Sequence, residues 1–309
     1  MDGPVAVIGA GSIGVGFAIV FARVGVAVRL QDPDPARRAA APREIATRLD
    51  DLHAGGLIAE TAATILARVA VVETVPEALA GVVLVQECAP ENLALKRALF
   101  ADLDRCAAPA TVLASSTSAL QPSCFAGDLP GRARCLVAHP ANPPYLITVI
   151  EVVPAPFTDP AAVARCEAIY AAAGLAPIRV RQEVEGFVYN RLQGALLREA
   201  YCLVRDGVAT VDDIDRLVRD GLGLRWFVIG PFETVDLNTR GGIAAHALKM
   251  GPAYERMGNE RGQHDPWTPG IVAAVEASRR AAMPLAAWDE RVAWRDRMLM
   301  RLLADRRRP

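Results

Sequence analysis

The hydrophobic pattern changes along the chain, from short apolar runs to longer helical stretches. A β-branched run at 5–8 is followed by a glycine-rich turn, an apolar helical stretch that ends near Val24, and a second apolar run at 27–30. Because strands that alternate with helices form parallel sheets, the pattern predicts an α/β fold with a Rossmann-type doubly wound sheet. Further strands are predicted at 69–72, 82–86, 111–114, 135–138, 147–153 and 178–180.

Strand-like runs fade after residue 180, and a long helix is predicted over 186–206. Its apolar positions at helical spacing are Val188, Leu192, Leu196, Ala200 and Leu203. A stripe of this kind is suited to packing against another surface. The pattern therefore predicts an α/β domain of residues 1–185 and a smaller all-α domain of residues 186–309.

The composition is that of a folded protein of two domains. The chain has 309 residues, of which 52% are hydrophobic and 22% are charged, so it lies far from the composition of disordered chains. Its 34 basic and 35 acidic residues give a net charge of −1, which argues against a nucleic-acid or anionic-membrane partner.

Two further features favour a cytoplasmic protein that is not inserted in a membrane. The six cysteines include no CxxC pair, which is typical of reduced, buried thiols in a cytoplasm. The uncharged stretch 4–22 imitates a membrane segment, but it contains four glycines and lacks the basic leader of a signal peptide.

The glycine-rich turn matches a dinucleotide-binding fingerprint. Gly9, Gly11 and Gly14 fit GxGxxG between a strand and a helix, and Asp32 closes the second strand. The three glycines permit a tight turn, approach of a pyrophosphate and close helix packing, while the carboxylate would accept hydrogen bonds from the ribose hydroxyls. The predicted cofactor contacts here are Gly9, Gly11, Ser12, Ile13, Gly14 and Asp32.

A carboxylate at the end of the second strand favours NAD over NADP. Asp32 would repel a 2′-phosphate, although Arg37 and Arg38 follow it closely. The alternative for these arginines is an exposed helix face. The predicted cofactor is NAD.

Candidate catalytic residues follow later strands. Ser118 lies in a hydroxyl cluster after one predicted strand, His139 ends another, and Glu151 lies on the next. Ligand-binding groups of doubly wound sheets gather beyond the carboxyl ends of strands, which is where Ser118 and His139 are expected. From the residues alone, His139 could be structural, Ser118 a helix cap and Glu151 a rim carboxylate.

Seven segments resemble the 3-hydroxyacyl-CoA dehydrogenase superfamily, and most closely its lambda-crystallin or L-gulonate 3-dehydrogenase branch. They occur in the family's order over nearly the whole length. The segments are GAGSIG (9–14), QECAPEN (86–92), SSTSAL (115–120), AHPANPPYLITVIEVVP (138–154), EGFVYNRLQGALLREA (185–200), GLGLRWFVIGPFETVDLN (221–238) and WRDRMLMRL (294–302).

The resemblance implies a role for each candidate residue. His139 would be the general acid/base, and Glu151 would orient it and stabilise the imidazolium. Ser118 and Asn190 would donate hydrogen bonds to the reacting oxygen. The alternative for Asn190 is to satisfy backbone groups of the first helical turn. The residues implied to lie near the nicotinamide are Glu87, Asn92, Ser118 and Asn142.

The substrate implied by the resemblance is a small 3-hydroxy acid, oxidised to the 3-oxo acid. The segment after His139 departs from that of the acyl-CoA enzymes, which favours a small free acid, and the resemblance to the L-gulonate 3-dehydrogenase branch puts L-gulonate first. A carnitine-like acid is the second candidate, since the segment around Trp226 resembles L-carnitine dehydrogenases, and a short 3-hydroxyacyl-CoA is the third. Arg225 could bind a substrate carboxylate, or it could form a structural ion pair.

Three further expectations complete the interpretation. The apolar stripe and the resemblance together indicate a homodimer. No histidine has a partner at metal-ligand spacing, so no catalytic metal is expected, and the absence of a GxSxG segment argues against a hydrolase. The alternative of another class is a non-catalytic, crystallin-like protein that only binds NAD.

Overall fold

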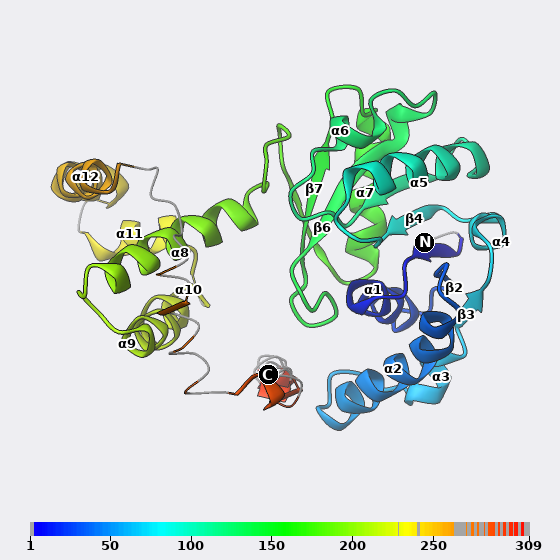
Figure 1. Ribbon diagram of the computed structural model, residues 1–309, viewed down its shortest axis with the longest axis horizontal. Helices are drawn as coiled ribbons and strands as arrows, with labels where there is room; N and C mark the ends of the chain where they lie inside the picture. Colours follow the sequence, from blue (N-terminus) through cyan, green and yellow to red (C-terminus); the bar gives the residue numbers. More distant parts are fainter. Residues whose placement is uncertain are drawn as a thin grey trace. The chain divides into compact units, whose positions relative to one another are not determined.

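The computed structural model describes residues 3–227, 229–239 and 242–262, and scattered positions between 270 and 305 (Figure 1). The chain divides into two compact units. The first comprises Met1–Arg191 and Arg291–Pro309, and the second comprises Leu192–Glu290. The boundary predicted near Glu185 stays a prediction. Met300 is buried in the core of the first unit, which the predicted division did not include.

An eight-stranded sheet forms the centre of the first unit. Its strand order is β3-β2-β1-β4-β5-β6-β7-β8, and every neighbouring pair is parallel except β6 with β7. The order reverses between β1 and β4, which is the point where doubly wound sheets bind nucleotides. The strands are β1 Val5–Ile8, β2 Val28–Gln31, β3 Val69–Val72, β4 Leu84–Glu87, β5 Val112–Ser115, β6 Cys135–Pro140, β7 Val149–Pro154 and β8 Ala176–Arg179.

Helices cover both faces of this sheet, as the predicted Rossmann-type fold requires (Figure 1). Successive strand residues point to opposite faces. Val5 and Val7 therefore pack with α1, α2, α3 and α7, while Ala6 and Ile8 pack with α4, α5 and α6. The helices are α1 Ser12–Ala22, α2 Pro35–Ala54, α3 Ala62–Leu66, α4 Val75–Leu79, α5 Leu93–Cys106, α6 Pro122–Ala126 and α7 Pro160–Ala172, with a 3₁₀ turn at Arg132–Arg134.

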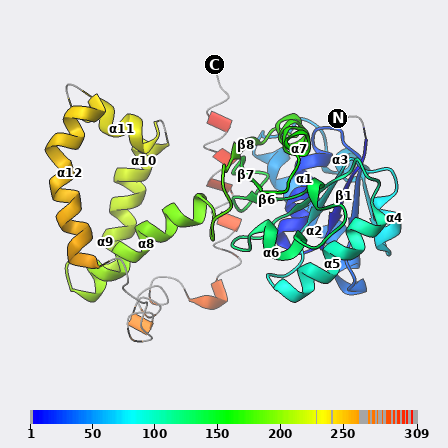
Figure 2. The same ribbon diagram turned by 90° about the horizontal axis from the view of Figure 1, so that it is seen from above.

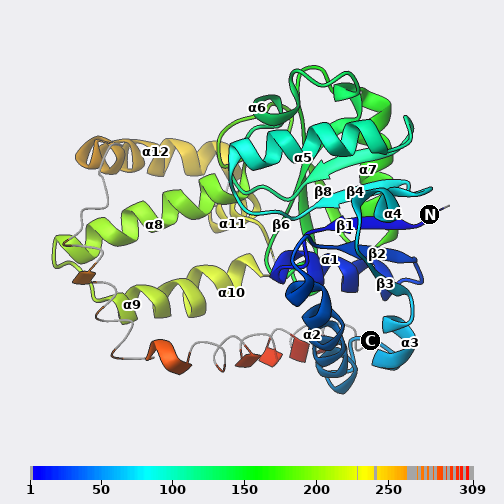
Figure 3. The same ribbon diagram turned by 45° about the vertical axis from the view of Figure 1, so that its right-hand side comes forward.

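Helices make up the described part of the second unit, as predicted (Figures 2 and 3). The long helix begins later than expected, at Tyr189, because Gly186 and Phe187 adopt positive φ angles of 72° and 49°. A left-handed residue does not continue an α-helix. The elements are α8 Tyr189–Arg205, α9 Val211–Arg216, a π-helical segment Leu217–Leu222, α10 Gly223–Trp226, α11 Pro231–Asn238, α12 Gly242–Arg261 and a 3₁₀ turn Leu285–Ala287.

The cysteines differ in part from the prediction of buried thiols. All six are free, but only three are buried and the other three are half-buried. Burial raises the pKa of the Cys135 thiol to about 12. Among the described residues, no helix is long and apolar enough to cross a membrane.

Candidate active site

The glycine turn after β1 is shaped by two close backbone approaches. Gly9 has a φ of 106°, and a Cβ there would lie 2.7 Å from the Cys88 carbonyl oxygen. A Cβ on Gly14 would lie 1.8 Å from the Gly9 oxygen, so α1 can start where it does only with glycine at this position. Gly11 is the N-cap of α1 and has no side chain to satisfy the first-turn N–H groups. These groups are placed to bind a phosphate.

Asp32 is held beside this turn. Its Oδ2 accepts a hydrogen bond from the Ala10 N–H at 2.7 Å, and its Oδ1 accepts one from the Asp34 N–H at 2.9 Å. Asp32, Gly9 and Gly11 line a cavity of about 610 Å³. Carboxylate oxygens retain further lone pairs, so Asp32 fits the predicted contact to ribose hydroxyls. The cradle therefore fits the adenosine half of NAD.

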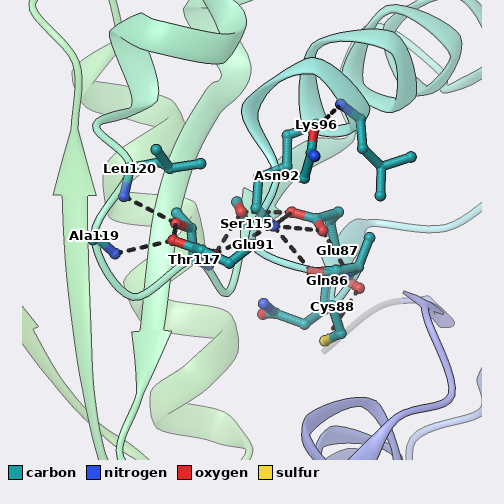
Figure 4. Close-up of polar contacts among 12 residues, drawn as sticks. Gln86, Glu87, Cys88, Glu91, Asn92, Lys96, Ser115, Thr117, Ala119 and Leu120 are labelled. Carbon is teal, nitrogen blue, oxygen red and sulfur yellow. Dashed lines mark hydrogen bonds and ion pairs between the residues drawn. The ribbon is translucent and has the colours of Figure 1, made fainter.

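Glu87, implied to lie near the nicotinamide, is fully buried in a polar network at the end of β4 (Figure 4). Its two carboxylate oxygens lie 2.9 and 3.0 Å from Nζ of Lys96, which is also fully buried. Ser115 and the Ala89 N–H donate to the same carboxylate. Glu87 therefore has a structural part, joining β4, β5 and α5, that the sequence did not indicate.

Two neighbours of this network shape the loop after β5 (Figure 4). The Thr117 hydroxyl donates to Glu91, and the Leu120 N–H donates to the Thr117 oxygen at 3.0 Å. Ser118 lies exposed in the same loop. Asn92, also exposed, caps α5 by accepting from the Leu95 N–H at 3.0 Å. Lys96, Glu91 and Thr117 were missed by sequence reasoning, and the only signal was a lysine on the apolar side of a helix.

His139 and Glu151 form a buried pair across two strands. The antiparallel register of β6 and β7 puts the two residues directly opposite each other. Nδ1 of His139 lies 2.7 Å from Oε2 of Glu151, and only 6% and 3% of the two residues are exposed. The imidazole is also 5.6 Å from the ring of the buried Phe187, measured between ring centroids. Sequence reasoning had placed both residues on neighbouring strands, and the structure brings them together.

The second oxygen of Glu151 binds the start of α8. Oε1 accepts hydrogen bonds from the N–H groups of Val188 at 2.7 Å and Tyr189 at 2.9 Å. Burial acts to raise the pKa of Glu151, but the hydrogen bonds from His139, Tyr189 and Val188 outweigh it and the pKa is lowered. Glu151 therefore stays ionised while it is hydrogen-bonded to His139 and to the start of α8.

The remaining candidates occupy different places. Asn190 Nδ2 donates to the Ser118 carbonyl oxygen at 2.8 Å, so these two predicted contacts to the reacting oxygen are adjacent. Asn142 is exposed in the loop after His139. Arg225 lies on α10, in the second unit. Within the described residues, no group of His, Cys, Asp or Glu side chains is arranged to hold a metal ion.

Comparison with known proteins identifies the family. The model of the 3-hydroxyacyl-CoA dehydrogenase NAD binding domain matches residues 4–184, and the model of the C-terminal domain matches residues 186–288. The chain belongs to the 3-hydroxyacyl-CoA dehydrogenase family. Membership confirms the predicted fold, the NAD cofactor and the dehydrogenase class.

Individual relatives span most of the chain. Lambda-crystallin of Oryctolagus cuniculus is 38% identical over 307 residues, covering 97% of this chain and 95% of its own. L-carnitine dehydrogenase of Streptomyces griseus is 42% identical over 265 residues, covering 85% of this chain and 76% of its own. Among solved structures, 5-formyl-3-hydroxy-2-methylpyridine 4-carboxylic acid 5-dehydrogenase matches with a TM-score of 0.77 and 28% identity, over 97% of this chain and 99% of that one.

Proposed function

We propose that this enzyme oxidises a small 3-hydroxy acid to the 3-oxo acid, with L-gulonate as the first candidate substrate. The observation that carries the proposal is the buried His139–Glu151 pair, which lies in the same unit as the NAD cradle. A buried histidine held by an ionised carboxylate is suited to move a proton to and from a substrate hydroxyl.

His139 is the general acid/base in this proposal. With its Nδ1–H donated to Glu151, the Nε2 atom is left to accept the proton of the substrate hydroxyl. The ionised Glu151 then stabilises the imidazolium. NAD, when bound, supplies the acceptor for the hydride that leaves the same carbon.

Ser118 and Asn190 orient the reacting oxygen. Both are adjacent, and the Ser118 hydroxyl and the Asn190 amide are donors that suit a developing carbonyl oxygen. Glu87, Asn92 and Asn142 remain proposed neighbours of the nicotinamide, with Glu87 acting through the loop that it anchors.

The choice of L-gulonate rests on the lambda-crystallin relatives, which match nearly the full chain. A carnitine-like substrate is the second candidate, because two Streptomyces L-carnitine dehydrogenases are 42% identical. Trp226, 40% exposed on α10, could supply an aromatic face for a trimethylammonium group. Arg225 is proposed to bind the substrate carboxylate.

A panel of substrates tests the proposal. The purified protein is incubated with NAD and either L-gulonate, L-carnitine, other small 3-hydroxy acids or a short 3-hydroxyacyl-CoA, and NADH absorbance is followed. The proposal expects the highest kcat/KM for L-gulonate. A preference for L-carnitine selects the second candidate, and a preference for the CoA ester overturns the small-acid class. Tight NADH binding without turnover of any compound indicates a non-catalytic, crystallin-like protein.

The assembly proposed is a cytoplasmic homodimer. Leu192 and Leu196 of the predicted stripe are 64% and 36% exposed on α8. Apolar side chains at this spacing favour burial against a second copy. Sedimentation velocity tests it, since a monomer at micromolar concentration would contradict the proposal.

A further inference from the structure

A single arginine enters the cavity at the predicted adenosine site. Arg37 lies on α2 and lines the cavity of about 610 Å³ together with Asp32, Gly9 and Gly11. It is the only basic side chain among the described residues that line this cavity. An arginine so close to Asp32 is the group to which the 2′-phosphate of NADP would bind.

The guanidinium of Arg37 is already engaged within the protein. Nη1 and Nη2 donate to the two carboxylate oxygens of Glu44, at 2.9 and 3.2 Å. Nη2 also donates to the Ala10 carbonyl oxygen at 2.5 Å. These contacts form a bidentate ion pair across nearly two turns of α2, and the same residue, Ala10, donates its N–H to Asp32.

The Glu44 carboxylate balances the positive charge of Arg37 while the guanidinium stays protonated. The hydrogen bonds to Glu44 raise the pKa of Arg37 above its ordinary value, and the charge of Asp32 contributes in the same direction. Arg38, the other nearby arginine, donates to the carbonyl oxygens of Asp32 and Pro33. Both arginines that follow Asp32 are thus bound to groups of the protein itself.

We propose that Glu44 is a specificity-determining residue, which keeps the enzyme selective for NAD by binding Arg37 and denying it to the 2′-phosphate of NADP. Selectivity for NAD over NADP then has two causes. Asp32 repels the phosphate, and Glu44 holds the Arg37 cation that could otherwise compensate for this repulsion. The inference concerns the cofactor and is independent of the substrate proposed above.

The repulsion by Asp32 and the pairing of Arg37 with Glu44 together lead to a distinct prediction for Asp32 variants. Asp32→Ser removes the repulsion, yet Arg37 stays paired with Glu44, so NADPH binding improves little. Asp32→Ser combined with Glu44→Gln releases the guanidinium, since a neutral amide cannot replace the bidentate carboxylate. The double variant is therefore expected to bind NADPH about tenfold more tightly than Asp32→Ser alone.

The experiment measures dissociation constants of NADPH and NADH by isothermal titration calorimetry on the full chain. A matched control, Asp32→Ser with Glu73→Gln, removes a carboxylate that lies 3.7 Å from Arg38 and is not in the cavity lining. A further variant adds Arg37→Ala to the double variant. The proposal expects the gain only with Glu44→Gln, and its loss when Arg37 is removed.

Three results would overturn the proposal. They are a folded double variant that binds NADPH no more tightly than Asp32→Ser, an equal gain in the Glu73 control, and a gain that persists without Arg37. If the double variant does not fold, Glu44→Gln alone decides through the ratio of the NADPH to NADH dissociation constants. The ratio is expected to fall severalfold, and an unchanged ratio contradicts the inference.

Discussion

Glu151→Gln separates the two tasks of the carboxylate, because the amide can perform one and not the other. Its oxygen can still accept the N–H groups of Val188 and Tyr189 at the start of α8. Its NH₂ group would face Nδ1 of His139, which must then accept a hydrogen bond rather than donate one. The proton moves to Nε2, and His139 can no longer take a proton from the substrate.

The expected magnitudes follow from these contacts. The corresponding acid-to-amide change in a serine-protease triad lowers kcat by about 10⁴, and we expect a loss of about 10³ to 10⁴ here. Stability should fall by only about 1–2 kcal/mol, since the helix contacts are kept. Glu151→Ala leaves all three donors without this acceptor and should destabilise the protein by about 3–5 kcal/mol.

The pH dependence of the free energy of unfolding provides a second test of the Glu151 carboxylate. The pKa of Glu151 is lowered in the folded protein, so its contribution to stability is complete above the ordinary value of 4.5. That contribution is lost as the pH falls through the lower folded value. The difference in the free energy of unfolding between the wild type and Glu151→Gln should therefore narrow on acidification.

The assays are steady-state turnover, NADH titration and urea unfolding of the wild type and both variants. A folded Glu151→Gln protein that binds NADH normally and keeps kcat within about tenfold of the wild type would refute the orienting role of Glu151.

Three other predictions concern separate parts of the molecule. Gly14→Ala places a Cβ 1.8 Å from the Gly9 oxygen, so the turn must move and NADH affinity should fall at least about tenfold; wild-type affinity by titration would contradict this. Lys96→Met leaves the buried Glu87 without its charged partner and should lower the free energy of unfolding, measured with urea, by about 3–5 kcal/mol. Adding Glu87→Gln should restore part of this loss, and a Lys96→Met variant as stable as the wild type would exclude the proposed role. Arg225→Ala should raise KM for the hydroxy acid far more than KM for NAD, and equal effects on both would remove the proposed carboxylate contact.

Local patterns made the sheet and the NAD cradle predictable. The close approach of Gly14 to Gly9 involves residues of one turn, so the sequence spacing alone indicates it. Strand ends depend on pairing with the neighbouring strand, which a local pattern does not show. The last strand, for example, starts at Ala176 rather than at 178, since β8 pairs with β7 from Val149 onward and an edge strand tolerates Pro177.

Long-range contacts could not be predicted in the same way. The start of α8 at Tyr189 depends on the left-handed turn at Gly186 and Phe187 and on two hydrogen bonds to Glu151. Val188, which the predicted helix over 186–206 includes, therefore precedes α8. The Glu87–Lys96 pair arises from packing of α5 on the sheet. The sequence pattern does not show which residue of α5 faces which residue of the sheet.

The most direct test of the account is His139→Gln, assayed with NAD and the substrate that the panel identifies. We expect turnover to fall by about 10³ or more while the NADH dissociation constant stays within about threefold of the wild type. Turnover near the wild-type rate in this variant would contradict the claim that His139 carries the proton.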